Sequence, residues 1–273
     1  MVRMKQARIF GMVVVAALAA GFGLRGAGAQ KAAAKQPARP QLVILDTDIG
    51  DDIDDAFALA LVLRSPELRL LGVTTAYGDT EMRARLVDRY LKAVGRSGVP
   101  VAAGVRTKSG TMSQAAYALA EPGRKHADGV DFLLREIRAH PGEITLIAIG
   151  PLVNVQAAIE RDGATFRKLK RVVMMGGSVY RGYDQGGGGA GQTSQTPSAE
   201  WNILCDPKGA QELLASGVPV YMMPLESTQI RLEQAEQAAI FSHGSALTDQ
   251  LTLLYHEWSG KGEWRTFGRT SRA

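Results

Sequence analysis

The chain is poor in cysteine and in aromatic residues. Its 273 residues include one cysteine, Cys205, and 6% aromatic side chains. A single cysteine excludes an intramolecular disulfide and gives no basis for a zinc site, so Cys205 is interpreted as a small packing residue. The sequence also lacks a basic patch interleaved with aromatic residues, the pattern typical of nucleic-acid binding. We therefore do not expect nucleic acid as a partner.

A strong net charge is also missing once the first residues are set aside. The formal net charge is +5, but four basic residues and no acid precede residue 30, which leaves about +1 (5 − 4) for the rest. Those basic residues flank an apolar run over 12–20, and residues 27–29 (Ala-Gly-Ala) form a small-residue cleavage sequence. We expect 1–29 to be a signal peptide and 30–40 a disordered lead-in, with the protein exported, either periplasmic or secreted. The apolar run is short for a membrane span, so no stable span is expected after cleavage; an uncleaved anchor is the alternative.

The remaining length suits one α/β domain over 41–258. Short apolar strands without polar alternation are separated by amphipathic helices, which is typical of a mostly parallel sheet covered on both faces. We therefore predict a Rossmann-like open α/β sheet, with a glycine-rich loop at 185–192 inside the domain. The expected strands cover 42–46, 70–75, 99–102, 144–149, 172–175 and 219–223, and the expected helices cover 54–63, 81–94, 130–139, 152–159, 207–215 and most of 232–258.

A loop rich in aspartate follows the first expected strand. Six carboxylates fall within residues 46–55, directly after the apolar run 42–45. The carboxyl ends of parallel strands are where α/β sheets bind ligands. Ca²⁺ takes about six to eight oxygen ligands and neutralises clustered carboxylates well. Helix capping is the alternative, but it accounts for only one or two acids. The loop therefore predicts a divalent metal site.

Polar groups also follow the other expected strands. Each has a simple structural alternative, such as a helix start, a tight turn or a solvated acid. Taken together with the acidic loop, they indicate one crevice at the carboxyl edge of the sheet. The groups are Asp79 after 70–75, Asn154 after 144–149, Gly176-Gly177 after 172–175, Glu200 and Asn202 before the helix at 207–215, and Glu226 after 219–223.

The motifs at these strand ends resemble those of the inosine–uridine preferring nucleoside hydrolase family. The resemblance covers residues 41–230, and the set as a whole is specific, although each piece alone is weak. The linker between the two parts of the acidic motif is two residues longer than is usual in the family. The motifs are Asp46-Thr47-Asp48-Ile49-Gly50 with Asp54-Asp55-Ala56, Thr74-Thr75 with Gly78-Asp79, Ile149-Gly150-Pro151-Leu152-Val153-Asn154, Met175-Gly176-Gly177 and Glu200-Trp201-Asn202.

This resemblance implies Ca²⁺-dependent hydrolysis of the N-glycosidic bond of ribonucleosides, in a homodimer or homotetramer. It makes Asp48 a metal ligand and the general base for the attacking water. Asp55 and the backbone carbonyl of Ile149 would be the other metal ligands. Whether Asp51 or Asp52 takes a direct part in the site stays open. The remaining implied roles are Asp54 on the ribose 2′-hydroxyl, Asn202 on the 3′-hydroxyl, Glu200 on the 5′-hydroxyl, Met175 in the sugar pocket, Asp79 as a further substrate contact where the family often has Asn, and Asp46 and Asp52 as supports behind the ligands.

One further metal-binding Asp of the family, usually in a His-Asp-Pro motif, has no counterpart here. His243 is followed by Gly244, and His256 by Glu257. Residues 259–273 have no core period, so we expect an incomplete domain with an atypical tail, through truncation or a shifted reading frame. The missing Asp leaves one alternative open, a protein that binds nucleosides without turnover. Asp46-Thr47-Asp48 after a strand leaves another, a phosphatase of the HAD type, which would use the first Asp as nucleophile and Mg²⁺ as metal.

Overall fold

The computed structural model describes residues 39–108, 110–183, 196–228, 230 and 232–260. The expected signal peptide, nearly all of the lead-in, the glycine-rich loop and the tail after residue 260 lie outside these residues and stay predictions. Within the described part of the chain, every helix is too short or too polar to cross a membrane.

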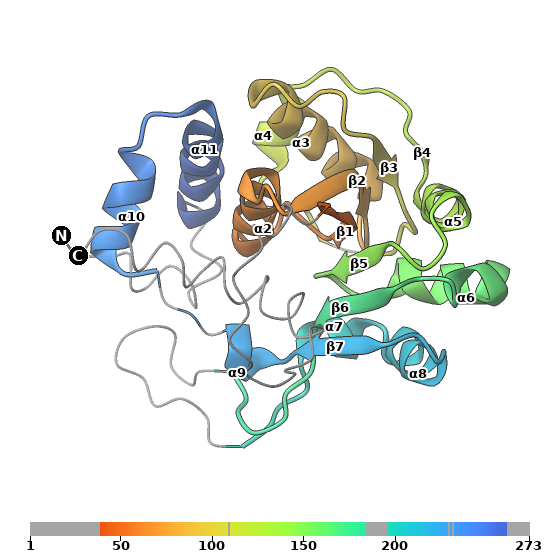
Figure 1. Ribbon diagram of the computed structural model, residues 1–273. Coiled ribbons are helices and arrows are strands. Elements are labelled where there is room, and N and C mark those ends of the chain that lie inside the picture. The colour runs from red at the N-terminus through yellow and green to blue at the C-terminus, as the bar shows by residue number, and fades with distance from the viewer. Residues whose placement is uncertain (1–38, 109, 184–195, 229, 231, 261–273) are drawn as a thin grey trace, which may run out of the picture.

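Seven parallel strands form one open sheet in the order β4-β3-β2-β1-β5-β6-β7 (Figure 1). The sequence predicts the open parallel sheet, but not this order and not the short strand β4. The central strand β1 pairs with β2 on one side and with β5 on the other. Its side chains alternate between the two faces, Val43 and Leu45 toward one core cluster and Ile44 toward the other. The strands are β1 Gln41–Thr47, β2 Leu68–Thr75, β3 Val101–Ala103, β4 Ala127–Asp128, β5 Thr145–Ala148, β6 Arg171–Met175 and β7 Val220–Met223.

Helices cover both faces of this sheet (Figure 1). On one face α2, α3, α4 and α11 share a core cluster with β1 and β2, and on the other face α5, α6 and α8 share a second cluster with β5 and β6. The helices are α2 Asp54–Arg64, α3 Thr80–Ala93, α4 Ala115–Leu119, α5 Gly129–Ala139, α6 Val153–Phe166, α7 Trp201–Cys205, α8 Pro207–Ala215, α9 Leu225–Thr228, α10 Gln234–Phe241 and α11 Ala246–Gly260.

The strand order contains a switch point beside β1. The chain runs outward through β2, β3 and β4, and then returns to place β5 on the opposite side of β1. Ligands bind to sheets of this kind outside the carboxyl ends of the strands at such a point. The register pairs Asp46 with Ala148 in β5 and Thr47 with Thr75 in β2. Continuing the pairing of Asp46 with Ala148 by two residues on each strand places Asp48 level with Gly150.

Candidate functional site

Asp46 lies at the base of the candidate site and joins three elements. Its side chain is fully buried near the end of β1. Its Oδ1 accepts hydrogen bonds from Thr74 Oγ1 in β2 at 2.5 Å and from Asn154 Nδ2 in α6 at 2.7 Å. Burial raises the pKa of Asp46 to about 6, against the opposing effect of these two bonds. The supporting role implied for Asp46 agrees with this position, whereas a nucleophile that attacks a phosphate would need an accessible carboxylate.

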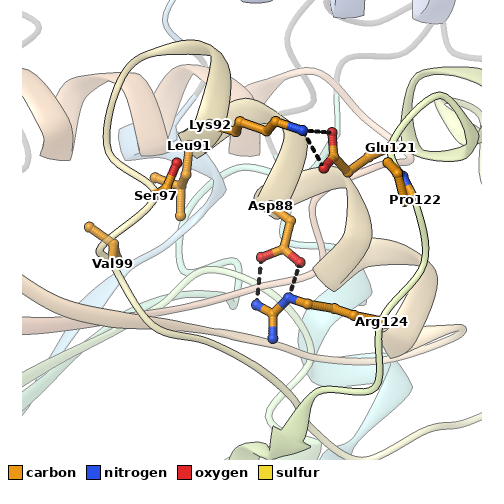
Figure 2. Close-up of a pocket in the computed structure, with 8 residues that line it drawn as sticks. All are labelled: Asp88, Leu91, Lys92, Ser97, Val99, Glu121, Pro122 and Arg124. Atoms are coloured by element: carbon orange, nitrogen blue, oxygen red, sulfur yellow. Dashed lines mark hydrogen bonds and ion pairs between the residues drawn. The ribbon is translucent and has the colours of Figure 1, made fainter.

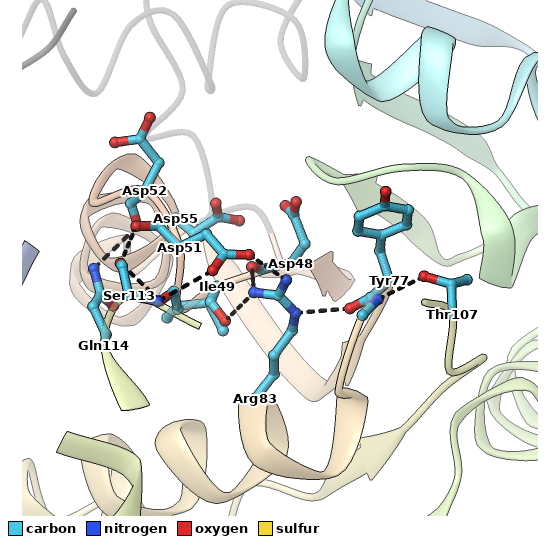
Figure 3. Close-up of polar contacts among 12 residues, drawn as sticks. Asp48, Ile49, Asp51, Asp52, Asp55, Tyr77, Arg83, Thr107, Ser113 and Gln114 are labelled. Carbon is cyan, nitrogen blue, oxygen red and sulfur yellow. Dashed lines mark hydrogen bonds and ion pairs between the residues drawn. The ribbon is translucent and has the colours of Figure 1, made fainter. Parts of the chain in front are cut away.

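Asp48 follows the strand and points out of the sheet edge (Figure 3). Its carboxylate lies against Gly150, because a Cβ atom on that glycine would be 2.6 Å from Oδ1 of Asp48. Burial raises the pKa of Asp48 to about 7, although the nearby guanidinium of Arg83 lowers it. The fold therefore brings Asp48 beside Gly150, the residue after Ile149.

Asp55 comes to the same place from the first turn of α2. Its side chain is buried, and Oδ1 accepts a hydrogen bond from the hydroxyl of Thr47. Burial, followed by repulsion from Asp48 and Asp54, raises the pKa of Asp55 well above its usual range. The carboxylates of Asp48 and Asp55 are therefore close enough for the charge of Asp48 to oppose ionisation of Asp55. Asp54 is exposed in the same turn of α2.

Asp51 and Asp52, whose roles the sequence left open, behave differently from each other. Asp51 forms an ion pair of 2.5 Å with the buried Arg83 and accepts from the backbone N–H of Ser113 at 3.3 Å. Asp52 accepts from the N–H of Ile53 at 2.9 Å, and burial, then Asp54, raises its pKa to about 7. Figure 3 shows the Asp52 side chain directed away from Arg83. Asp51 is therefore committed to holding the loop.

Glu200 and Asn202 reach the site from the start of α7. The carboxylate of Glu200 caps this helix by accepting from the N–H groups of Asn202 at 2.9 Å and Ile203 at 3.1 Å. It also accepts from Gly177 N–H at 2.9 Å, after β6. Asn202 Nδ2 donates to the carbonyls of Ile149 at 3.0 Å and Met175 at 3.2 Å. The structure thus joins four of the predicted site residues, and it gives Glu200 and Asn202 structural bonds that the sequence did not reveal.

Asp79 marks the start of a helix, which was the structural alternative to its implied role as a substrate contact. Its side chain caps α3 by accepting from Met82 N–H at 3.2 Å. It also forms an ion pair of 3.0 Å with Arg106, in which both side chains are largely exposed. Both contacts direct the carboxylate toward α3 and Arg106, and neither joins it to the acidic loop.

Two residues of the site were missed from the sequence, Arg83 and Tyr77. Arg83 lies three and four residues before Leu86 and Val87, on the buried face of α3, and only 1% of it is exposed. The sequence could have pointed to Arg83, because it is a charged residue at a helical position that the apolar pattern assigns to the buried face. Tyr77 has a left-handed backbone with φ of 59°, and its hydroxyl hydrogen-bonds Cys205. Nothing in the sequence pattern distinguished this tyrosine.

The chemistry of the donor set fits a hard cation. In the part of the chain that the structure describes, no group of three or more His, Cys, Asp and Glu side chains is arranged to hold a metal ion. The predicted set is of another kind, because it combines two carboxylates, Asp48 and Asp55, with the main-chain carbonyl of Ile149. These ligands are all oxygens, which Ca²⁺ and Mg²⁺ prefer. Burial is the main cause of the raised pKa values of both acids, and neighbouring carboxylates add to it, so a bound cation would favour their ionised forms.

A cavity of about 270 Å³ lies elsewhere, along the second half of α3 (Figure 2). Its walls carry two ion pairs, Arg124 with Asp88 at 2.6 Å and Lys92 with Glu121 at 2.9 Å. None of the predicted site residues lines it. The buried ring of His126 also contacts Asp88. These ion pairs join α3 to the segment before α5, and we call this group the charged clamp.

Carboxylates gathered at the switch point of an open parallel sheet are typical of α/β proteins that bind a ligand at the carboxyl edge of the sheet. The chain belongs to the inosine-uridine preferring nucleoside hydrolase family, whose model matches residues 43–267. This match extends beyond the motif-based resemblance, which ends near residue 230. The predicted family and the predicted α/β fold are both confirmed.

Individual relatives agree with this assignment. The pyrimidine-specific ribonucleoside hydrolase RihA of Enterobacter sp. strain 638 is 34% identical over 245 residues, which cover 83% of this chain and 74% of RihA. An uncharacterised protein of Schizosaccharomyces pombe is 36% identical over 202 residues, or 68% of this chain; the match spans only 61% of that relative's length. A solved plant nucleoside hydrolase, PpNRh1, superimposes with a TM-score of 0.67 at 26% identity, covering 84% of this chain and 76% of PpNRh1.

Proposed function

We propose that this chain hydrolyses the N-glycosidic bond of ribonucleosides to the free base and ribose. The observation that carries the proposal is the position of the Asp48 carboxylate, against Gly150 at the switch point between β1 and β5. Asp55 shares this position, and the carbonyl of Ile149 adjoins it. The family assignment favours this reaction over the phosphatase alternative.

We propose Ca²⁺ as the cofactor, held by Asp48, Asp55 and the carbonyl of Ile149. When bound, the cation lowers the pKa of a water molecule and holds vicinal hydroxyls. The fit rests on the oxygen-only donor set. Burial, followed by repulsion from Asp48 and Asp54, also raises the pKa of Asp55, and a bound cation would offset both effects.

The protein's own groups supply the rest of the chemistry. Asp48 takes the proton of the attacking water, because its carboxylate lies past the end of β1, against Gly150 at the switch point. Breaking the glycosidic bond builds positive charge on the ribose, and the clustered carboxylates stabilise that charge. Asp54, exposed on the first turn of α2, is proposed to accept from the 2′-hydroxyl.

Free acceptor positions limit how Glu200 and Asn202 contribute. A carboxylate has about four lone-pair sites, and three backbone N–H groups already use Glu200. One site is left, enough for a single ribose hydroxyl. The amide nitrogen of Asn202 is committed to Ile149 and Met175, so its Oδ1 is the atom left for a hydroxyl. We propose that these two oxygens, with Met175, grip the sugar.

The basic and then apolar first 29 residues support a second part of the proposal, that the protein acts on nucleosides outside the cytoplasm, either in the periplasm or after secretion. Assembly as a homodimer or homotetramer stays a prediction. Binding without turnover is the alternative function, favoured by the missing counterpart of the family's last metal-binding Asp.

The test is to incubate the purified full-length chain with Ca²⁺ and inosine, uridine, adenosine or cytidine, and to quantify free base and ribose. We expect release that stops with chelator and falls by about 10²- to 10⁴-fold in Asp48→Asn, the range for loss of a general base. Asp249→Asn, on the exposed side of α11, is the matched control and should retain full activity. Nucleoside binding by calorimetry without product would establish the binding-only alternative instead.

A further inference from the structure

Arg83 is the most deeply buried cation beside the acidic loop. Only 1% of the residue is exposed, although it is on α3 and the loop is between β1 and α2. A buried guanidinium is costly unless its donors are matched by acceptors. The purpose of this residue should therefore be visible in its partners.

All of those partners lie at the carboxyl edge of the sheet (Figure 3). Arg83 Nη1 donates to the carbonyls of Asp48 and Ile49, the latter at 3.0 Å. Nη2 pairs with Oδ2 of Asp51 at 2.5 Å. Nε donates to the carbonyl of Tyr77 at 2.8 Å. One planar group thus connects the loop after β1 to the loop after β2.

These contacts fix the backbone from which the Asp48 side chain projects. Two successive carbonyls, those of Asp48 and Ile49, turn toward the same nitrogen, which sets both peptide planes. Gly50, with φ of 123°, then allows the chain to turn back so that Asp51 reaches the guanidinium. On the other side, Arg83 holds Tyr77 in its left-handed conformation, a strained state for a residue with a side chain.

Stability alone does not explain this choice of residue. An apolar side chain of similar volume would fill the space at less cost, since replacing buried ionic groups by apolar ones is often neutral or stabilising. The rigid fork of arginine, by contrast, matches several fixed acceptors at once, which lysine cannot do. The contacts of the Arg83 guanidinium therefore hold the loop after β1 in one position.

We propose that Arg83 is a positioning residue for the reaction, acting through the backbone of Asp48, with Asp51 as its anchoring counter-ion. This inference rests on the proposed function of Asp48. Arg83 is buried, and its donors are directed to three backbone carbonyls and to the Asp51 side chain, so it orients the general base and does not touch the substrate.

The test compares Arg83→Lys with the matched control Arg85→Lys. Arg85 lies on the same helix and also donates to two backbone carbonyls, those of Leu119 and Glu121, but these belong to a different segment. We expect Arg83→Lys to lower kcat by about 10²-fold, the effect of a misplacement near 1 Å, with KM changed less than about threefold. Arg85→Lys should retain kcat within about twofold.

Asp51→Asn gives a second variant for the case that Arg83→Lys does not fold. Its side chain is 35% exposed and keeps its shape, so the fold is expected to tolerate the change. We expect a smaller fall in kcat, about tenfold, because Arg83 keeps its three carbonyl partners. A folded Asp51→Asn or Arg83→Lys protein with wild-type kcat would overturn the proposal.

Hydrogen exchange separates this proposal from the proposed function. We expect the amides of residues 49–51 to exchange at least about tenfold faster in Arg83→Lys than in Arg85→Lys or in the wild type. That result supports the positioning role even if the wild type hydrolyses no nucleoside, in which case only the proposed function fails. Unchanged exchange at these amides would refute the positioning role, whatever the activity of the wild type.

Discussion

Gly150 leaves room for the carboxylate of Asp48. A Cβ atom on Gly150 would be 2.6 Å from Oδ1 of Asp48 and 2.9 Å from its backbone nitrogen. Real Cβ atoms do not approach other heavy atoms so closely, and the backbone nitrogen cannot swing aside as a flexible side chain could. The absence of a side chain at the end of β5 is therefore what allows Asp48 to occupy the switch point.

Gly150→Ala should consequently disable the site while leaving the sheet in place. We expect the added methyl group to displace Asp48, which should reduce kcat by at least about tenfold and weaken Ca²⁺ binding. Initial rates and calorimetric titration with Ca²⁺ measure both effects. Gly98→Ala is the control, because a Cβ at Gly98 meets no atom within 4 Å. Equal kcat values for the two variants would contradict the steric argument.

Calcium should stabilise the fold through the same carboxylates. A cation present at about a hundred times its Kd raises the free energy of unfolding by about 2.7 kcal/mol. For a domain of this size that corresponds to an increase in Tm of about 5–10 °C. Thermal unfolding with Ca²⁺ and with chelator measures the shift, and Asp55→Asn should abolish most of it. A shift of wild-type size in Asp55→Asn would place the cation elsewhere.

His126 should make stability depend on pH in the neutral range. Burial lowers its pKa, but hydrogen bonds to Asp88 at 2.9 Å and Glu81 at 2.6 Å outweigh this and raise it above 6.5. A pKa raised in the folded state gives stability that is complete below about pH 6.5 and is lost as the pH rises through the folded value. The pKa of Asp88 is lowered, so its contribution is lost only under acidic conditions.

Urea unfolding at pH 5.5, 6.5 and 8 tests this prediction. The free energy of unfolding of the wild type should fall toward pH 8 more than that of His126→Gln, since glutamine can donate a hydrogen bond but does not titrate. Other buried acids titrate in both proteins, so the difference between the two isolates His126. His243→Gln, at an exposed position, should behave as the wild type does. Parallel pH profiles for wild type and His126→Gln would rule out the clamp as a titrating unit.

Glu257 should secure α11 to the rest of the domain. Its two carboxylate oxygens accept from the N–H groups of Ala116 at 2.7 Å and Tyr117 at 2.9 Å, at the start of α4. Glu257→Gln removes one acceptor and the charge that favours a helix N-terminus, so we expect a loss of about 1 kcal/mol. Urea unfolding measures it. Glu143→Gln, at an exposed position, should change stability by less than about 0.5 kcal/mol; the interaction is refuted if the two variants cost the same.

Most of the sheet could be predicted from the sequence, because apolar strand runs and amphipathic helices alternate clearly. The exceptions have local causes. The helix expected at 152–159 continues as α6 to Phe166, since Asp162 leaves helical geometry but caps the next turn through Thr165 N–H at 3.0 Å. The long helix expected over 232–258 divides into α10 and α11, where Gly244 adopts φ of 68°. The short elements α4, α7, α9 and β4 carry too few residues for a period to show.

The site was predictable in its location and less so in its contacts. Asp48 and Ile149 follow neighbouring strands, and parallel strands share a carboxyl edge; Asp55 joins them from the first turn of α2, which begins at the same edge. The bonds of Glu200 to Gly177 and of Asn202 to Ile149 join segments 23 and 53 residues apart, which no local pattern encodes. The partners of Arg83 are of the same kind, since they bring α3 together with the loops that follow β1 and β2.

The contacts of α4 set an order in which the protein can be completed during synthesis. Gln114, just before α4, binds the acidic loop through its backbone N–H to the carbonyl of Gly50 at 2.8 Å and through its side chain to the carbonyl of Asp52 at 3.2 Å. The first turn of α4 is in turn capped by Glu257, some 140 residues later. At about 5–20 residues per second, this cap leaves the ribosome many seconds after the acidic loop. The acidic loop is therefore among the first parts of the domain to be translated, but the helix cap that supports its neighbour α4 is among the last contacts that can form.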